Sequence, residues 1–499
     1  MSARLSLAKG WPFAATLLVS LVLYRFGIEL LVALAAGLVL SWVAYQFRVA
    51  TLAALSLVVL VPQLFLMIDL LPADWDVIAA GIRISDALLV GMLGASVANV
   101  LVIKGRPSVD RVLMGTSAVL GVLLLYAIVR NLGAFGLSAP GEFRFRYLIL
   151  SLPLYLALAI RDEHELASVQ RVIAVLPVLG VITALPVVVA AKGWDVGADS
   201  RFYPSAISLA LLYSAIWFGI SATRDRLRSG RVVSTAVLLL AGVFIVADSH
   251  RSVWLVAALS SLVLIRYGFI RLSRIWAWGL GAALGIGVVG VIVGLSGVNV
   301  LEYVSTRASA FLNPTADATS YWRLVVWKAY LGPWLANPVL GQGFGAYWDI
   351  YVPEFGGRTT VFPHSLYVVT LVKLGASGLA ALLGWFYAAW RALAFRVRQQ
   401  QGVMSISVPL VMGVLGVVGS LAYGTVYHLE FWSLAWLGVG LAEVSAFESS
   451  RPDWPRTERS LRHSRSFLAC NSGRPSGERG WAQGFGASER IPLISPADR

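Results

Sequence analysis

The chain has little charge and almost no cysteine. Only 13% of its 499 residues are Asp, Glu, Lys or Arg, roughly half the share usual in soluble domains. A single cysteine, Cys470, excludes an intrachain disulfide and a metal site built from several cysteine ligands. These shortages exclude a disulfide-stabilised secreted domain and argue against an ordinary soluble one.

Apolar residues are abundant instead. They make up 58% of the chain, and the mean hydropathy is +0.76, which is more apolar surface than one soluble core of this size can bury. The sequence therefore predicts an integral membrane protein. The net charge of +14 does not indicate nucleic-acid binding, because the basic residues lie between apolar runs, as in cytoplasmic loops.

The apolar runs predict an all-α polytopic protein, because about 20 apolar residues let a helix cross the hydrocarbon core. We expect about fourteen spans, or twelve to thirteen if short runs merge. The expected spans are Trp11–Tyr24, Gly27–Phe47, Thr51–Leu70, Ala87–Ile103, Val112–Val129, Tyr147–Ile160, Val172–Ala190, Pro204–Ser221, Val232–Ala247, Val253–Ile270, Ile275–Leu295, Ser365–Trp390, Val403–Tyr423 and Phe431–Ala446.

Short basic loops predict the orientation. With the N-terminus inside and its first apolar run retained as a signal-anchor, every strongly basic loop falls on one side, which is then cytoplasmic. Those loops hold Arg48; Lys104, Arg106 and Arg111; Arg224, Arg226, Arg228 and Arg231; Arg266, Arg271 and Arg274; and Arg391, Arg396 and Arg398. Residues 1–447 form the predicted transmembrane domain, and residues 448–499 a disordered cytoplasmic tail.

One long periplasmic loop, residues 296–364, is rich in Trp, Tyr, Gly and Pro. Its segment Tyr321–Ala336 predicts a helix lying in the headgroup region, where aromatic rings are well accommodated. That helix brings Arg323 to the depth of lipid phosphates. The Gly341–Gly345 string that follows, GQGFG, does not indicate nucleotide binding, because no strand precedes it.

Further polar residues interrupt apolar runs at the same outer face. Ser249, His250 and Arg251 form one such group, and His364 stands at the mouth of a span. A charged group at the bilayer centre costs about 2.5–3.5 kcal/mol on the insertion scale. Such groups usually face a partner or a substrate, so we regard them as candidate site residues.

These residues also carry a resemblance to a known family. Arg251 lies in a Ser-x-Arg-Ser-x-Trp setting, and NPVLGQGFGAY and PHSLYVVTLVKLGASGLAALL follow it in that order. From about Ala247 to Trp390 the chain resembles the O-antigen ligase and polymerase superfamily of bacterial envelope assembly. The resemblance implies a GT-C-like fold, an undecaprenyl-diphosphate-linked glycan donor, a glycan or lipid A core acceptor, and no metal or other cofactor.

The resemblance also assigns roles by position. Arg251 and Arg323 correspond to the family's two essential arginines, and His364 to its essential histidine. The chain departs from the family at His250, where a small polar residue is usual, at Ser365, where Asn is common, and at Lys373, where many members have Glu.

The chemistry suits these residue types. An arginine offers a two-pronged fork for the oxygens of a diphosphate leaving group, and a histidine accepts a proton near neutral pH. The further substrate-binding candidates are Ser249, His250, Tyr321, Trp322, Tyr367, Arg307 and Arg358. Solvated loop charges and an interfacial aromatic belt would explain several of them equally well.

Two functions remain open from the sequence. The first is a glycosyltransferase of the bacterial inner membrane with its active site facing the periplasm, acting as ligase or polymerase and inverting the anomeric centre. The alternative is a polysaccharide transporter or flippase of lipid-linked glycan. The ionisable candidates gather at the outer face rather than at the midplane of the bilayer, which favours the enzyme.

Overall fold

The fold is known from a computed structural model. It describes residues 38–65, 77–79, 82–102, 110–136, 138–160, 162–192, 205–224, 228–247, 251–268, 318–346, 350–352, 357–359, 365–400, 406–424 and 431–449. The predicted spans Trp11–Tyr24 and Ile275–Leu295, most of Gly27–Phe47 and nearly all of the predicted tail lie outside the described residues.

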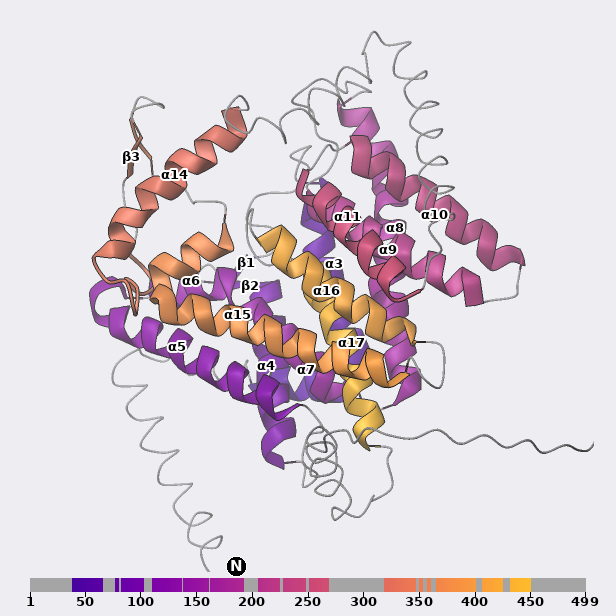
Figure 1. The fold of residues 1–499 in the computed structure, drawn as a ribbon, viewed down its shortest axis with the longest axis horizontal. Coiled ribbons are helices and arrows are strands. Elements are labelled where there is room, and N and C mark those ends of the chain that lie inside the picture. Colours follow the sequence, from indigo (N-terminus) through magenta and orange to yellow (C-terminus); the bar gives the residue numbers. More distant parts are fainter. Residues whose placement is uncertain are drawn as a thin grey trace, which may run out of the picture. The chain divides into compact units, whose positions relative to one another are not determined.

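The described part of the chain is built of helices, as predicted (Figure 1). They are Leu38–Gln46, α3 (Arg48–Phe65), α4 (Ile84–Val102), α5 (Arg111–Phe135), α6 (Ser138–Arg146), η2 (Leu148–Leu150), α7 (Ser151–Ala159), α8 (Glu163–Lys192), α9 (Ser205–Arg224), α10 (Arg228–Ala247), α11 (Arg251–Arg266), α14 (Ala318–Leu335), α15 (Leu366–Gln400), α16 (Val408–Gly424) and α17 (Phe431–Ser449). Two antiparallel hairpins add to them: β1 (Val77–Ala79) pairs with β2 (Ile82–Arg83), and β3 (Ile350–Val352) pairs with β4 (Gly357–Thr359).

Several helices are long and apolar enough to cross a membrane. Among the described residues these are α5, the Glu163–Val187 part of α8, and α15. A fourth candidate is the pair Leu38–Gln46 and Arg48–Pro62, which is bent by 114°. Shorter apolar helices occupy most of the other predicted spans. The chain is thus a polytopic helical membrane protein, while the number of its spans stays a prediction.

Some helices differ from the expected bounds. α8 begins at Glu163 rather than Val172, and α15 continues to Gln400, beyond Trp390. Apolar runs report only the part of a helix that suits lipid, whereas backbone hydrogen bonds extend the helix into polar sequence. For the same reason the short polar helix α6 escaped the prediction, which had a loop there.

Among the described helices, α17 is deeply buried. It packs against α16, α7 and α8, and its Trp432 and Trp436 are completely buried. Helix α16 approaches it closely through glycines: a Cβ on Gly413 would lie only 2.6 Å from the Cα of Gly440. Small residues at such crossings let helix backbones pack closely where no hydrophobic effect drives them together.

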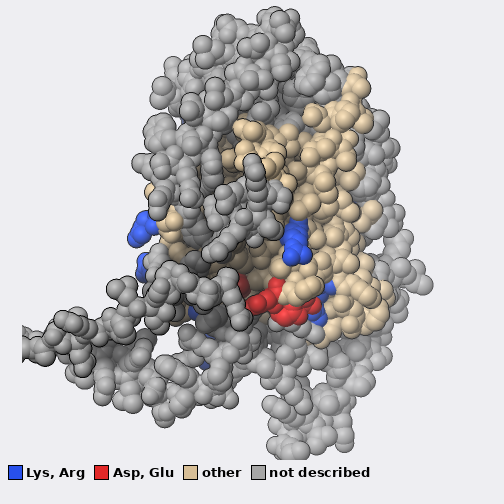
Figure 2. Space-filling view, turned by 90° about the vertical axis from the view of Figure 1, so that its right-hand side faces the viewer, with Lys and Arg blue, Asp and Glu red and all other residues tan. Residues whose placement is uncertain are grey.

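Helix α5 presents the opposite case. Val119, Val122, Leu125 and Val129 are all exposed along one side of it. Figure 2 shows another side of the molecule, where a few acidic and basic side chains lie among described residues that are otherwise uncharged. Exposed valines and leucines without charges are what a lipid-facing surface requires.

Charged residues gather at one end of the helices. Arg48 at the start of α3 contacts Glu165 of α8 at 2.7 Å, and Arg391 near the end of α15 lies 3.6 Å from Asp110 before α5. Glu443 of α17 lies within electrostatic reach of Arg396 and Glu163.

Candidate functional site

Helix α15 is interrupted where it meets the segment after α14. Gly375 has φ 70° and ψ −170°, far from helical values, so the helix consists of two parts that meet there. A break of this kind leaves backbone N–H and C=O groups without helical partners, which costs free energy in a buried setting. The segment Pro338–Ala346, which we call the glycine loop, supplies those partners.

Four backbone hydrogen bonds join the glycine loop to the break. The N–H groups of Gln342 and Gly343 donate to the carbonyls of Val372 and Lys373, each at 2.8 Å. In return the carbonyls of Pro338 and Val339 accept from the N–H groups of Ala376 and Ser377, at 2.8 and 3.1 Å. The loop therefore replaces the hydrogen bonds that the broken helix lacks.

This pairing explains why glycines occupy the loop. Gly341 has φ 66°, and a Cβ there would lie 2.4 Å from the carbonyl carbon of Lys373. A Cβ on Gly375 would lie 2.1 Å from the carbonyl oxygen of Val339. Positive φ and such close backbone approach are both open to glycine and closed to other residues. The glycines thus allow the loop to pair with the break in α15.

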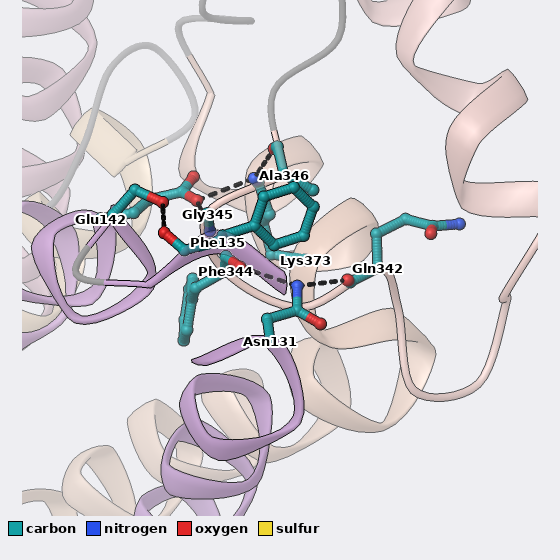
Figure 3. Close-up of polar contacts among 9 residues, drawn as sticks. Asn131, Phe135, Glu142, Gln342, Phe344, Gly345, Ala346 and Lys373 are labelled. Carbon is teal, nitrogen blue, oxygen red and sulfur yellow. Dashed lines mark hydrogen bonds and ion pairs between the residues drawn. The ribbon is translucent and has the colours of Figure 1, made fainter. Parts of the chain in front are cut away.

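Helix α5 holds the loop from the other side. Asn131 is buried, and its Nδ2 donates to the carbonyls of Gln342 and Phe344 at 2.9 and 2.7 Å (Figure 3). The neighbouring Arg130 is exposed and donates through Nη1 to the carbonyl of Gly341 at 3.0 Å. The last turn of α5 thus positions three loop carbonyls.

Phe344 anchors the tip of the loop in the protein interior. Its ring is completely buried, with ring centroids 6.2 Å from Phe143 and 5.4 Å from Tyr147. The Tyr147 hydroxyl in turn bonds Thr370 of α15 at 2.8 Å. This aromatic cluster attaches the loop and the first part of α15 to the α6–α7 region.

A buried ion pair completes the attachment. Lys373 Nζ lies 2.8 Å from Glu142 Oε2, and the same oxygen accepts from the N–H of Gly345 at 2.8 Å. Lys373 also donates to the carbonyl of Ala346 (Figure 3). The two side chains are only 5% and 2% exposed. The departure from the family at position 373 is therefore matched by an acidic partner on α6.

Helix α14 packs against the first part of α15 and runs in the same general direction (Figure 1). Val326 and Tyr330 are buried in a cluster with Val372, against which Trp322 and Val368 pack. Because the loop after α14 pairs with the break at Gly375, the beginning of α14 lies toward the beginning of α15. Arg323, three residues before Val326 and half-buried, belongs to that end of the pair.

The beginning of α15 also meets the end of α16. The Tyr367 hydroxyl donates to the carbonyl of Leu421 at 2.7 Å. Helix α16 packs against α11, and α11 starts at Arg251. Through α16, these contacts connect α11, which begins at Arg251, with the start of α15, which follows His364 in the sequence. Helix α14, which carries Arg323, packs on that same part of α15.

The predicted site residues are described to different extents. Arg323 and Trp322 are half-buried on α14, Tyr321 is exposed there, and Tyr367 is part-buried on α15. Arg251 is placed as the first residue of α11, and Arg358 pairs with Tyr351 between β4 and β3, in both cases by backbone alone. His364, Ser249, His250 and Arg307 lie outside the described residues.

Two residues in this arrangement were missed from the sequence: Asn131 and Glu142. Both lie more than 200 positions from their partners in the loop and in α15. In the sequence, Asn131 is a polar residue near the end of an apolar run, and Glu142 is an acid in a short polar segment. Neither feature identifies a partner.

Comparison with known families decides the identity of this region. Residues 235–383 match the family model described as O-antigen ligase. The match confirms the predicted resemblance of that region to the O-antigen ligase and polymerase superfamily. A search of curated proteins gives no match to the chain.

The O-antigen ligase region contains Arg251, α14 with Arg323, the glycine loop, His364 and the break at Gly375. Asn131 on α5 and Glu142 on α6, whose side chains hydrogen-bond to the glycine loop, lie outside the matched region. Among the described residues, no group of three or more His, Cys, Asp or Glu side chains lies together in a way that would hold a metal ion.

Proposed function

We propose that the protein is a glycosyltransferase that moves glycan from an undecaprenyl-diphosphate carrier to an acceptor at the periplasmic face of the bacterial inner membrane. The observation that carries the proposal is the O-antigen ligase match, which spans Arg251, Arg323 and His364. The acceptor is either another carrier-bound glycan or a lipid A core.

The charged end of the helices supports the proposed sidedness. Arg48, Arg391 and Arg396 lie near helix ends there, and basic loop residues favour the cytoplasmic side. The start of α15, at the opposite end of that helix, then faces the periplasm, as does the glycine loop. Helix α14 lies at headgroup depth in this arrangement, and Leu324 and Leu331, both exposed, face lipid.

In the proposed reaction the acceptor hydroxyl attacks the anomeric carbon of the donor glycan. The new glycosidic C–O bond forms as the bond from that carbon to the diphosphate oxygen breaks, and undecaprenyl diphosphate leaves. Arg251 and Arg323 stabilise the negative charge on the departing diphosphate. His364 takes the proton of the attacking hydroxyl. A single displacement of this kind inverts the anomeric centre. We also propose that the fold is GT-C-like.

The remaining candidates have secondary roles. Tyr321 and Trp322 present aromatic surface at the start of α14, where a sugar ring would stack. Ser249, His250, Arg307 and Arg358 are proposed as contacts to sugar or diphosphate. Tyr367 offers its ring, since its hydroxyl is used by Leu421.

The test uses cells that lack the native gene and carry Arg251→Ala, Arg323→Ala or His364→Ala. Each variant is expected in the membrane at wild-type amount, and each is expected to abolish the glycan polymer or lipid-attached glycan seen on gels. Arg391→Ala, at the other end of α15, serves as control and is expected to leave the product unchanged. Wild-type product in all three variants would refute the assignment.

A transporter remains the second candidate on the sequence pattern alone. Liposomes that contain the purified protein and lipid-linked glycan separate the two. Glycan that changes leaflet without any change in chain length or attachment would favour the transporter.

A further inference from the structure

One carboxylate oxygen joins three elements at the glycine loop. Glu142 Oε2, on α6, accepts from Lys373 Nζ on α15 and from the backbone N–H of Gly345, both at 2.8 Å. The same ammonium group donates to the carbonyl of Ala346. Any displacement of the loop relative to α15 would therefore disturb the ion pair and a backbone hydrogen bond together.

Stability alone is a weak reason for such a pair. The desolvation of two buried charges offsets most of their attraction, and well-packed apolar residues often stabilise a protein equally well. What charged hydrogen bonds do impose is direction, because each donor must point at its acceptor. The pair is therefore suited to fixing the geometry of the loop.

That geometry sets the position of α14. The helix leads directly into the glycine loop, and its Val326 packs beside Val372, the neighbour of Lys373. Arg323 lies one turn from Val326, and His364 lies two residues before α15 begins at Leu366. A shift of the loop along α15 would move the arginine relative to the start of that helix.

We infer that Glu142 and Lys373 are positioning residues for glycan transfer, acting through α14 on the place of Arg323 relative to the start of α15. This inference rests on the proposed function. A misplacement of about 1 Å between reacting groups lowers a rate by about 100-fold. Lys373→Met is therefore expected to lower kcat by about 10- to 100-fold. The KM for the lipid-linked donor is expected to change much less, because both side chains are buried.

The experiment measures geometry and rate on the same purified full-length protein. Nitroxide labels at Lys328→Cys on α14 and Val122→Cys on α5, both exposed, report the distance between these helices by pulsed electron resonance, with Cys470→Ser to remove the native thiol. The donor is lipid-linked glycan extracted from cells that lack the gene. The labelled protein with Glu142 and Lys373 intact should give a narrow distance distribution. The labelled Lys373→Met variant should give a broad or shifted one.

Arg391→Met is the matched control, because it removes another ion pair of α15 whose arginine is 51% exposed. It is expected to change neither the distance nor kcat. If Lys373→Met is not recovered folded, the double variant Glu142→Gln/Lys373→Met, which leaves no buried charge unpaired, takes its place with the same expectation.

Each outcome has one meaning. Unchanged distances in a folded variant would overturn the inference, whether or not kcat falls. Changed distances with an unchanged kcat would also overturn it. Changed distances in a preparation whose wild type transfers no glycan would contradict the proposed function and leave the role of the pair in placing α14 intact.

Discussion

Replacing Gly375 by alanine tests the interrupted helix most sharply. The residue has φ 70° and ψ −170°, a region that is essentially restricted to glycine and costs other residues about 1–3 kcal/mol. The new Cβ would also lie 2.1 Å from the carbonyl oxygen of Val339, and relieving such overlap costs about 1–3 kcal/mol more. We expect Gly375→Ala to lower the free energy of unfolding by about 2–6 kcal/mol.

The assay is titration with SDS in mixed micelles, followed by far-UV circular dichroism. Gly384→Ala in the same helix is the matched control, because no atom beyond the adjacent residues and the nearby backbone of α15 lies within 4 Å of its added Cβ. Alanine there is expected to stabilise the helix by about 0.5–1 kcal/mol. Equal unfolding midpoints for the two variants would refute the account of the break.

Two other substitutions test how the loop is held. Asn131→Ala leaves two carbonyls of the loop without their donor and is expected to cost about 2–4 kcal/mol. Ser117→Ala is expected to cost only about 1 kcal/mol, because it removes the acceptor of the Trp385 Nε1–H and a local hydrogen bond to the Leu113 carbonyl within α5. Equal losses in the SDS titration would contradict this. Phe344→Ala removes a buried ring and is expected to cost about 3–5 kcal/mol of unfolding free energy. Phe395 is 62% exposed, so Phe395→Ala should change stability little. A small loss at both positions would show that Phe344 does not anchor the loop.

The helices were largely predictable because lipid imposes a simple rule on sequence. The apolar run Phe431–Ala446 became α17, and the run starting at Ser365 became α15, which begins at Leu366. The rule fails where a helix leaves the lipid, so the first turns of α8 and all of α6 were not foreseen. It also says nothing of side-chain partners.

The face of α14 shows a second limit. Leu324, Trp327, Leu331 and Trp334 follow one another at helical spacing, a pattern that favours one buried apolar face. The residues buried against α15 are instead Val326 and Tyr330, while Leu324 and Leu331 are exposed. A helix between protein and lipid is apolar on both sides. Periodicity therefore cannot tell which side packs on the protein.

The site was only partly predictable, for a related reason. Arg251, Arg323 and His364 stand out because charge is rare in such a chain, and their assignment still rests on the family. Glu142 and Lys373 are 231 positions apart, and only the fold brings them together. The glycines of the GQGFG string are visible in the sequence, but the pairing of this string with the break in α15 depends on the backbone conformation of Gly375.

The most direct test of the central claim is the release of undecaprenyl diphosphate by the purified protein. Liposomes would contain the protein, lipid-linked glycan from cells lacking the gene, and either more of that donor or lipid A core as acceptor, with products followed by mass spectrometry. We predict one undecaprenyl diphosphate released for each glycan transferred, with both products lost together in Arg323→Ala. Glycan transfer at the wild-type rate in Arg323→Ala, or no carrier release by an intact wild-type protein with either acceptor, would contradict the account.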